Sequence, residues 1–262
     1  MIVKIIKCLK DNYSYLIIDE KLNTACVVDP SESRPIINYL KDNYSYIIID
    51  EKLNTACVVD PSEPQPIINY IDKNKINLKF ILNTHHHFDH VGGNKELKKK
   101  YNAKVVGYEG DKKRIPEIDI FLKDNEIWKN QNFKAKIFHI PGHTLGHICF
   151  HFFDEKLLFT GDTLFSLGCG RVFEGTYEMM FKSLDIIKNF PLETKIYCGH
   201  EYTLQNSKFC IKYDENNSKL KQKIDWIKNK LDMGLPTIPT TIKEELECNI
   251  FLRSDKKSVQ KN

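Results

Sequence analysis

Residues 84–90 read THHHFDH and follow the apolar run FIL at 80–82. Four histidines and one aspartate in so short a segment indicate a metal site just after a strand. His85 and His87 are two residues apart, so in extended backbone their side chains share one side while His86 points to the other. Asp89 and His90 follow where the chain leaves the strand toward two glycines, which permit a tight turn close to an ion.

Three more candidate ligands lie where strand patterns end: His143 in PGHTLGH, Asp162 in FTGDTLF and His200 in YCGHEY. Each directly follows a glycine, a setting in which backbone can approach a ligand closely. Neutral imidazoles and carboxylates form a nitrogen and oxygen ligand set suited to zinc, iron or manganese. Together with the first segment these groups exceed the needs of one ion, and two ions roughly 3.5–4 Å apart that share a carboxylate would use them all.

All nine histidines of the chain fall between positions 85 and 200. A histidine near a strand end is more often a hydrogen-bonded structural residue than a ligand, and we interpret His86, His139 and His151 in this way. His147 follows His143 by four residues, and we expect it to support the ligands through a hydrogen bond.

Residues 10–40 and 41–71 are tandem copies of one 31-residue unit that differ at only four positions. Each copy predicts a strand, a turn, a second strand and a short helix. Two copies are too few for a solenoid, in which stacked repeats bury a continuous core. If the domain has one place for this element, we expect residues 42–71 to occupy it, because they run directly into the histidine motif. Residues 2–6 predict a first strand, but they are joined to the other copy.

Beyond the repeat, strand patterns dominate up to residue 201 and purely helical patterns follow. Strands are predicted at 78–84, 103–108, 135–140, 148–153, 156–162 and 195–201, and helices at 94–101 and 176–190. Two further helices are predicted at 204–213 and 217–234, the second ending at Gly234 and Pro236. We therefore expect two domains, a metal-binding domain at 1–203 and a helical domain at 204–262.

Composition limits the functions that the chain can have. It has 262 residues, 41% of them hydrophobic, and no run of roughly 18 apolar residues that could span a membrane. Its first residues lack the features of a secretory signal, so we expect a cytoplasmic protein without a membrane partner. Eight scattered cysteines without CxxC spacing predict reduced thiols. The net charge of +4 is spread along the chain and forms no basic stripe, so no nucleic-acid partner is expected. We separately expect a monomer or weak dimer.

These motifs resemble the metallo-β-lactamase superfamily and, more narrowly, the glyoxalase II (hydroxyacylglutathione hydrolase) family. The first likeness rests on THHHFDH, PGHTLGH, FTGDTLF and CGHEY. The second rests on GDTLFSLGCGRVFEGT, CGHEYTLQN, GLPTIPTTIKEE and FLRSDKKSVQ, and the likeness covers most of the chain from residue 42. It implies an α/β fold, a four-layer αβ/βα sandwich followed by a small helical domain that completes the substrate cleft.

The resemblance also implies two divalent metal ions, with zinc preferred and iron or manganese as alternatives. One ion would be bound by His85, His87 and His143, and the other by Asp89, His90 and His200. Asp162 would be shared by both ions, and His86 would bind neither. Asp162 and Asp89 are the implied catalytic residues, the first by bridging the ions and the second by handling a proton.

The implied reaction is hydrolysis of S-D-lactoylglutathione, and of related S-2-hydroxyacylglutathiones, to glutathione and D-lactate or the corresponding acid. This reaction is the second step of methylglyoxal detoxification. A water acidified by the two ions would attack the thioester carbonyl. Arg171 and Phe173 stand where the family commonly has lysine and tyrosine, so the charge is kept and one phenolic hydrogen bond is lost. The implied substrate anchors are Arg171, Phe173, Tyr202, Arg253, Lys256 and Lys257.

Other functions fit parts of the pattern. A persulfide dioxygenase of the same superfamily would use a single iron bound through His85, His143 and Asp162, but the complete second ligand set and the helical end favour the thioesterase. A phosphodiesterase or nuclease would need nucleic-acid features that the sequence lacks. A metal-binding scaffold inactivated by the duplication is the non-enzymatic alternative.

Overall fold

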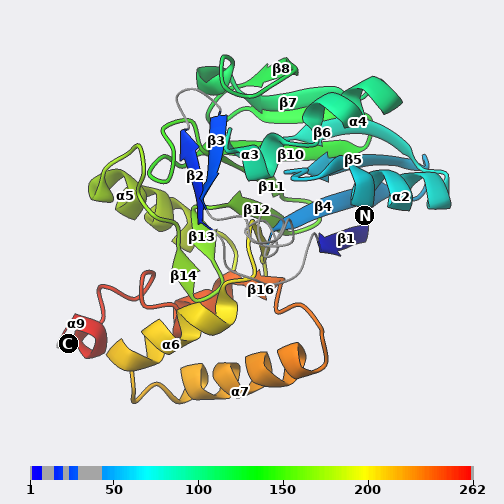
Figure 1. Ribbon diagram of the computed structural model, residues 1–262. Helices are drawn as coiled ribbons and strands as arrows, with labels where there is room; N and C mark the ends of the chain where they lie inside the picture. Colours follow the sequence, from blue (N-terminus) through cyan, green and yellow to red (C-terminus); the bar gives the residue numbers. More distant parts are fainter. Residues whose placement is uncertain (1, 8–14, 20–23, 29–42, 261–262) are drawn as a thin grey trace.

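Two six-stranded sheets pack face to face in the computed structural model of the protein, which describes residues 2–7, 15–19, 24–28 and 43–260 (Figure 1). The first sheet has the order β1 (Ile2–Lys7), β4 (Tyr44–Asp50), β5 (Thr55–Val59), β6 (Asn77–Leu82), β7 (Lys104–Tyr108) and β8 (Ile118–Leu122). The second has the order β16 (Thr240–Thr241), β15 (Lys195–Cys198), β12 (Leu157–Gly161), β11 (Ile148–Phe152), β10 (Phe133–His139) and β9 (Ile127–Asn130).

Helices cover the outer faces of both sheets, which makes four layers in the order αβ/βα. On the first sheet lie α2 (Pro64–Asn74) and α4 (Asn94–Tyr101), and on the second α5 (Tyr177–Lys188) and α8 (Ile242–Cys248). Ile67 and Ile71 of α2 and Leu97 of α4 pack with Val58 and Ile81 of the first sheet. Every residue of β4 and β5 is buried, because one face of the sheet packs against the second sheet and the other against helices. Strands buried on both faces have largely apolar sequences without strict alternation. The predicted fold class is confirmed.

The main core lies between the sheets and is rich in aromatic side chains. Tyr46 of β4 contacts Phe159 of β12 and Tyr197 of β15 edge-on or tilted, with ring centroids 5.5 Å and 5.2 Å apart. Phe80 of β6 contacts Trp128 of β9 in the same manner at 5.2 Å. Aromatic pairs of this geometry stabilise a core beyond the area that they bury, so they hold the two sheets at a fixed spacing.

The second copy of the repeat, as expected, forms the two strands and the helix that belong to the first sheet and its outer face. β4, β5 and α2 all come from residues 41–74, and β1 pairs directly with β4 in antiparallel register, Ile2 opposite Ile49 and Lys7 opposite Tyr44. The first copy contributes β2 (Tyr15–Asp19) and β3 (Thr24–Val28), which pair with each other in a separate two-stranded sheet. The joining of residues 2–6 to the first copy therefore does not prevent β1 from pairing with the second.

The chain after residue 202 is helical, with α6 (Thr203–Tyr213), α7 (Ser218–Asp232), α8 and the short α9 (Lys257–Gln260). In Figure 1, α6 and α7 lie beyond one end of the sandwich. Their small core contains Cys210, Leu220 and Ile227 and also includes Leu167 from the earlier part of the chain. Between these helices the chain returns to the second sheet, where β16 pairs with β15. No helix in the described ranges is long and apolar enough to cross a membrane.

Several elements were not predicted. β9 (IWKN) is short and largely exposed, with one buried side chain, so it lacks the apolar pattern of a strand, whereas β8 (IDIFL) has an apolar pattern that was visible in the sequence but was not interpreted as a strand. α8 begins with a capping box in which Thr241 and Glu244 exchange side-chain and backbone hydrogen bonds. This signal was visible in the sequence as TIKE. The remaining short elements are α3 (Phe88–Val91), the 3-10 helix η1 (Glu109–Asp111) and the hairpin of β13 (Leu164–Phe165) and β14 (Gly168–Cys169).

Candidate metal centre

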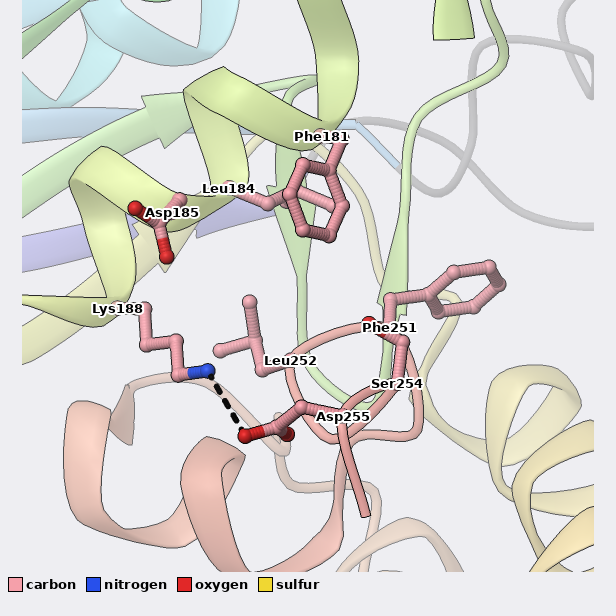
Figure 2. Close-up of a pocket in the computed structure, with 8 residues that line it drawn as sticks. All are labelled: Phe181, Leu184, Asp185, Lys188, Phe251, Leu252, Ser254 and Asp255. Carbon is pink, nitrogen blue, oxygen red and sulfur yellow. Dashed lines mark ion pairs between the residues drawn. The ribbon is translucent and has the colours of Figure 1, made fainter. Parts of the chain in front are cut away.

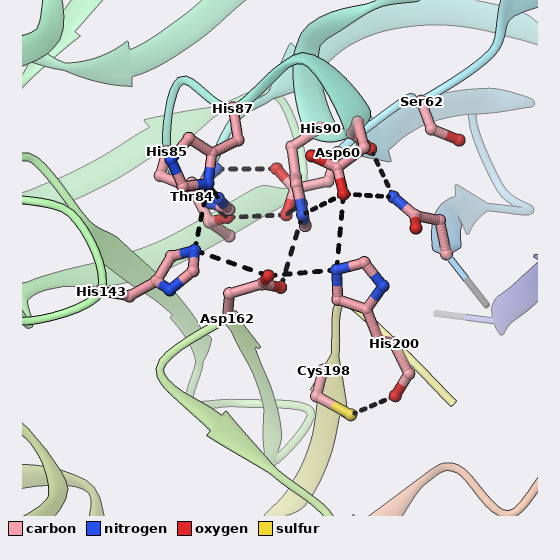
Figure 3. A network of polar contacts seen from close by, with 12 residues as sticks. Asp60, Ser62, Thr84, His85, His87, His90, His143, Asp162, Cys198 and His200 are labelled. Carbon is pink, nitrogen blue, oxygen red and sulfur yellow. Dashed lines mark hydrogen bonds and ion pairs between the residues drawn. The ribbon is translucent and has the colours of Figure 1, made fainter. Parts of the chain in front are cut away.

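The structure brings together all seven predicted ligands at one end of the sandwich, where strands of both sheets terminate (Figure 3). The first sheet supplies two histidines after β6 and two residues in α3, and the second supplies one residue after each of β10, β12 and β15. The site therefore depends on both halves of the sandwich. In chain order these residues are His85, His87, Asp89, His90, His143, Asp162 and His200.

Three imidazole rings form a first cluster. His87 Nδ1 lies 3.1 Å from His85 Nε2 and 3.1 Å from His143 Nε2. His143 Nδ1 donates to the carbonyl of Arg171 at 2.8 Å, so in the neutral ring Nε2 carries the lone pair. Burial lowers the pKa of all three rings, that of His87 to about 3, and keeps them neutral near pH 7. Neutral imidazole is the form that binds a metal ion.

Asp89, His90 and His200 form a second cluster. Asp89 Oδ2 lies 3.5 Å from His200 Nε2 and 3.8 Å from His90 Nε2. The side-chain amide of Asn43 donates to Asp89 Oδ2 at 3.1 Å and to its carbonyl at 2.8 Å, which fixes the carboxylate. Burial alone would raise the pKa of Asp89, but His90 and His200 outweigh it and lower that pKa, so the carboxylate is ionised.

Asp162 lies between the clusters. Its Oδ2 is 3.1 Å from His200 Nε2 and 3.6 Å from His143 Nε2, and its Oδ1 is 3.4 Å from His90 Nε2. Burial would raise the pKa of Asp162, yet His200 and His90 hold it well below the usual value. One ionised carboxylate thus faces donor atoms of both clusters, which is the arrangement that lets two ions share a ligand.

The unsatisfied atoms at this site fit metal binding. Within the described part of the chain, His90 Nε2 and Asp162 Oδ1 are buried without a hydrogen bond. Buried polar atoms are normally satisfied, so such atoms indicate a missing ion or water. Burial lowers the pKa of His90, but Asp162, Asp89 and Asp60 outweigh it and raise the pKa well above the usual value. A divalent cation would replace the proton that this ring otherwise carries among three carboxylates.

Asp60 was missed in the sequence and supports both clusters. Its carboxylate accepts from the Thr84 N–H at 2.8 Å, from the Thr84 hydroxyl at 2.7 Å and from His90 Nδ1 at 3.1 Å. The Thr84 hydroxyl therefore accepts from His85 Nδ1 at 3.0 Å. His85 and His90 therefore both use Nδ1 in these hydrogen bonds, which leaves Nε2 of each ring available for a metal ion. Asp60 already accepts three hydrogen bonds, so we interpret it as a residue that orients ligands.

Glycines let the segments approach each other at the site. A Cβ at Gly199 would overlap the Asp162 carboxylate, and one at Gly170 would overlap the Asp162 carbonyl. Gly161, which precedes Asp162, has φ of +47°, a conformation that side chains other than glycine rarely adopt. The glycines before the predicted ligands thus serve the close packing that the sequence suggested.

The other histidines make the contacts of supporting residues. His147 Nε2 accepts from the Asp162 N–H at 3.1 Å, and its ring stacks on His85 at 4.6 Å, in agreement with the expected supporting role. His86 points away from the clusters to Asp111 at 3.2 Å. His139 donates to a carbonyl, that of Leu145, at 2.7 Å.

Three of the predicted substrate anchors lie beside the metal clusters. The Phe173 ring is 57% exposed and lies 5.1 Å from the His143 ring and 6.0 Å from the His87 ring. The Tyr202 ring stacks on His200 at 4.7 Å with an interplanar angle of 1°. The Arg171 carbonyl accepts from His143, while the residue is exposed.

The other three predicted anchors lie in the C-terminal segment. The guanidinium of Arg253 is largely buried and binds Asp214 at 2.9 Å, so its charge is already balanced within the protein. Lys256 and Lys257 are exposed. A hollow of about 30 Å³ separates α5 from residues 251–255, and the ion pair of Lys188 with Asp255, 3.6 Å apart, closes one side of it (Figure 2).

Comparisons of sequence identify the family of the chain. The profile of the metallo-beta-lactamase superfamily matches residues 13–200, and the profile of the hydroxyacylglutathione hydrolase C-terminus matches residues 201–262. A hydroxyacylglutathione hydrolase of Pelagibacter ubique is 68% identical over 254 residues, which are 97% of this chain and 93% of that protein. One of Methylococcus capsulatus is 42% identical over 97% of this chain and 88% of its own length.

Solved structures share the fold at lower identity. The BLEG-1 B3 metallo-beta-lactamase aligns with a TM-score of 0.63 and 21% identity, over 80% of this chain and 94% of its own. ETHE1 from Myxococcus xanthus aligns with a TM-score of 0.60 and 22% identity, over 91% of this chain and 83% of its own. The profiles and the sequence relatives together show that the chain belongs to the hydroxyacylglutathione hydrolase (glyoxalase II) family within the metallo-β-lactamase superfamily.

Proposed function

We propose that the protein hydrolyses S-D-lactoylglutathione, and related S-2-hydroxyacylglutathiones, to glutathione and the free hydroxy acid. The observation that carries this function is the pair of ligand clusters with Asp162 between them. Membership of the hydroxyacylglutathione hydrolase family supplies the substrate class. In this role the enzyme completes the detoxification of methylglyoxal.

We assign the first metal position to His85, His87 and His143, and the second to Asp89, His90 and His200. Asp162 is shared between them. Zinc is the proposed occupant, since nitrogen and oxygen ligands at buried positions suit it, although iron and manganese accept the same set. Bound there, the ions supply Lewis acidity that acidifies a water molecule and polarises the thioester carbonyl.

The residues of the chain prepare the site for this chemistry. Asp60 and the Arg171 carbonyl fix the orientation of His90 and His143, so these rings need no reorganisation during the reaction. Asp89, held by Asn43, is ionised and can accept a proton from the attacking water. The leaving group is a thiolate, which departs without a dedicated general acid.

We place the substrate across the exposed ring of Phe173 and the stacked ring of Tyr202, which flank the two clusters. The exposed cations Arg171, Lys256 and Lys257 are the proposed partners of the glutathione carboxylates. Arg253 is a weaker candidate than its sequence suggested, because Asp214 already binds its guanidinium. We therefore expect it to shape the C-terminal segment that carries the two lysines.

We further propose a domain boundary after residue 203 and a cytoplasmic location. The boundary is supported by the small core around α6 and α7, most of whose buried residues lie after residue 203. The location is supported by six cysteines with free thiols among the described side chains, which indicate a reducing compartment.

The direct test is release of glutathione from S-D-lactoylglutathione by metal-replete protein, together with a count of bound metal. Turnover with about two ions per chain is expected. A protein that binds two ions but releases no thiol would contradict the function. A single bound iron and oxygen uptake with glutathione persulfide would instead identify a persulfide dioxygenase.

A further inference from the structure

A second charged cluster lies behind the first metal position and contains none of the proposed ligands. Its members come from three separate segments. Asp111 is fully buried, and although burial raises its pKa, hydrogen bonds from His86 and Arg114 outweigh this and keep the carboxylate ionised. A buried, charged carboxylate is retained only with good partners. The cluster consists of His86, Asp111, Arg114 and Glu174.

Arg114 connects the other members. Its guanidinium binds the Asp111 carboxylate with two nitrogens, Nε at 3.0 Å and Nη2. Its third nitrogen, Nη1, donates to Glu174 Oε1 at 2.5 Å and lies 3.4 Å from His86 Nε2. A planar guanidinium can bridge two carboxylates in this way, whereas an ammonium is a single point of charge.

Glu174 extends this connection to the loop that carries His143. Its other oxygen accepts from the Leu145 N–H at 2.8 Å. The backbone N–H groups of Phe173 and Glu174 both donate to the His143 carbonyl at 3.3 Å. The His143 ring itself donates to Arg171 in the same segment. Residues 171–174 therefore hold both the backbone and the ring of His143.

The loop that carries His143 is packed closely against the segments that carry Asp111 and Glu174. A Cβ at Gly146 would overlap the Asp111 carboxylate, and a Cβ at Gly175 would lie 2.8 Å from Gly142 Cα. The loop of His143 is thus packed directly against the segment of Asp111 on one side and the segment of Glu174 on the other. Arg114 is the side chain that bridges those two flanking segments.

We propose that Arg114 is a positioning residue for the first metal position. By bridging Asp111 and Glu174 it holds the His143 loop so that His143 Nε2 faces His85 and His87. The inference rests on the proposed function only through the assignment of these three histidines to one ion. Within the described residues, no hydrogen bond or ion pair joins Arg114 or Glu174 to Asp89, His90 or His200, so the second position is expected to be independent of the bridge.

The test is stepwise Zn²⁺ binding to metal-free full-length protein, measured by competition with a chromophoric chelator. In Arg114→Ala one of the two binding steps should weaken by roughly 10–100-fold, the usual effect of losing a residue that orients a ligand, and the other step should not change. Arg114→Lys should give an intermediate loss, because one ammonium cannot reproduce the bridge.

Lys98→Ala is the matched control. Lys98 is also half-buried and pairs with a carboxylate, that of Asp119 at 2.9 Å, but it lies on α4 and contacts none of the proposed ligands. Its Zn²⁺ affinities should equal those of the wild type. Metal-free Arg114→Ala should melt below Lys98→Ala, because it removes a partner of the buried Asp111 carboxylate. Selective weakening of one Zn²⁺ step is therefore the readout that a general loss of stability would not produce.

Two results would overturn the inference. In one, Arg114→Ala binds both ions as tightly as the wild type. In the other, both steps weaken by the same factor, which would make Arg114 a general structural residue. Neither result depends on thioester hydrolysis by the wild type, so a failure of the proposed function would be recognised separately.

Discussion

Asp162 contacts donor atoms of both ligand clusters, which gives one substitution an effect at both metal positions. Asp162→Asn keeps the size of the side chain and removes its charge. We expect loss of most bound metal and at least a roughly 100-fold fall in kcat/KM, since a shared charged ligand contributes to binding both ions. Metal analysis and the thioester assay measure this, with the exposed Asp185→Asn as control. Retention of one full equivalent of metal would argue against sharing.

His151 provides a test of pH dependence away from the metal centre. Its ring is buried against Phe190, with centroids 4.6 Å apart. Burial, with a smaller effect of Lys136, lowers its pKa from 6.5 to about 4. As pH falls through this interval, the unfolded chain gains a proton that the folded chain excludes, so stability is lost.

His151→Phe should remove this loss, which amounts to about 2 kcal/mol at about pH 5. Urea unfolding of both proteins should therefore show a smaller decrease for the variant between about pH 7.5 and about pH 5. Equal decreases would mean that His151 is protonated in the folded protein.

At the residue scale the ligands were predictable because their spacing is local. The alternation of His85 and His87, and the glycines before the later ligands, are visible in the sequence. Asp60 could not be predicted, because its partner Thr84 lies 24 residues away and the two meet only when β5 and β6 pair. Arg114 was missed for the same reason, as 60 residues separate it from Glu174.

At the scale of elements, the repeat offers a pair of matched variants. Asp29 and Asp60 are equivalent positions in the two copies, and Asp60 is the one that contacts Thr84 and His90. Asp60→Asn should weaken metal binding roughly 10–100-fold, while Asp29→Asn should leave it unchanged. Chelator competition measures both. Equal losses in the two variants would show that the first copy also supports the site.

Deletion of residues 10–40 should leave a folded protein that binds metal, because β1 would still be joined to β4 and the whole of the second copy remains. Circular dichroism and metal analysis of the shortened chain test this. Failure of this chain to fold, while a chain without residues 41–71 folds, would assign the first copy to the sheet.

Elements with strong periodicity were predicted well, and the edges of the sheets were not. α4 and α5 lie within a residue or two of their predicted ranges, because their apolar positions recur at helical spacing and face a sheet. β8 and β9 are edge strands with one buried side chain each, and β9 carries no apolar pattern, while the apolar residues of β8 (IDIFL) were visible in the sequence but were not interpreted as a strand. The pairing of β1 with β4 joins strands on either side of the first copy of the repeat, and a local sequence pattern cannot predict such a distant partner.

At the scale of the whole molecule, the metal centre joins the two sheets. Four proposed ligands come from the first sheet and its loops, and the other three come from the second. Bound ions therefore stabilise the packing of one sheet on the other, since they bind the folded state in preference to the unfolded chain. Removal of metal should lower the melting temperature by about 10 °C.

Thermal unfolding with and without a chelator checks this effect, and added Zn²⁺ should reverse it. Asp162→Asn should show a much smaller change, because it binds little metal. An unchanged melting temperature in the wild type after complete metal removal would indicate that the sandwich is stable without its ions.

The direct pairing of β1 with β4 has a consequence for chain entropy. The strands are separated by residues 8–43, whereas without the first copy only residues 8, 9 and 41–43 would join them. For a flexible connection, the entropic cost of closing the longer loop is greater by only about 2 kcal/mol, because the cost grows with the logarithm of length. The junction between β1 and β4 is therefore a permissive insertion point, at which the gene can gain a segment of 31 residues without losing the fold.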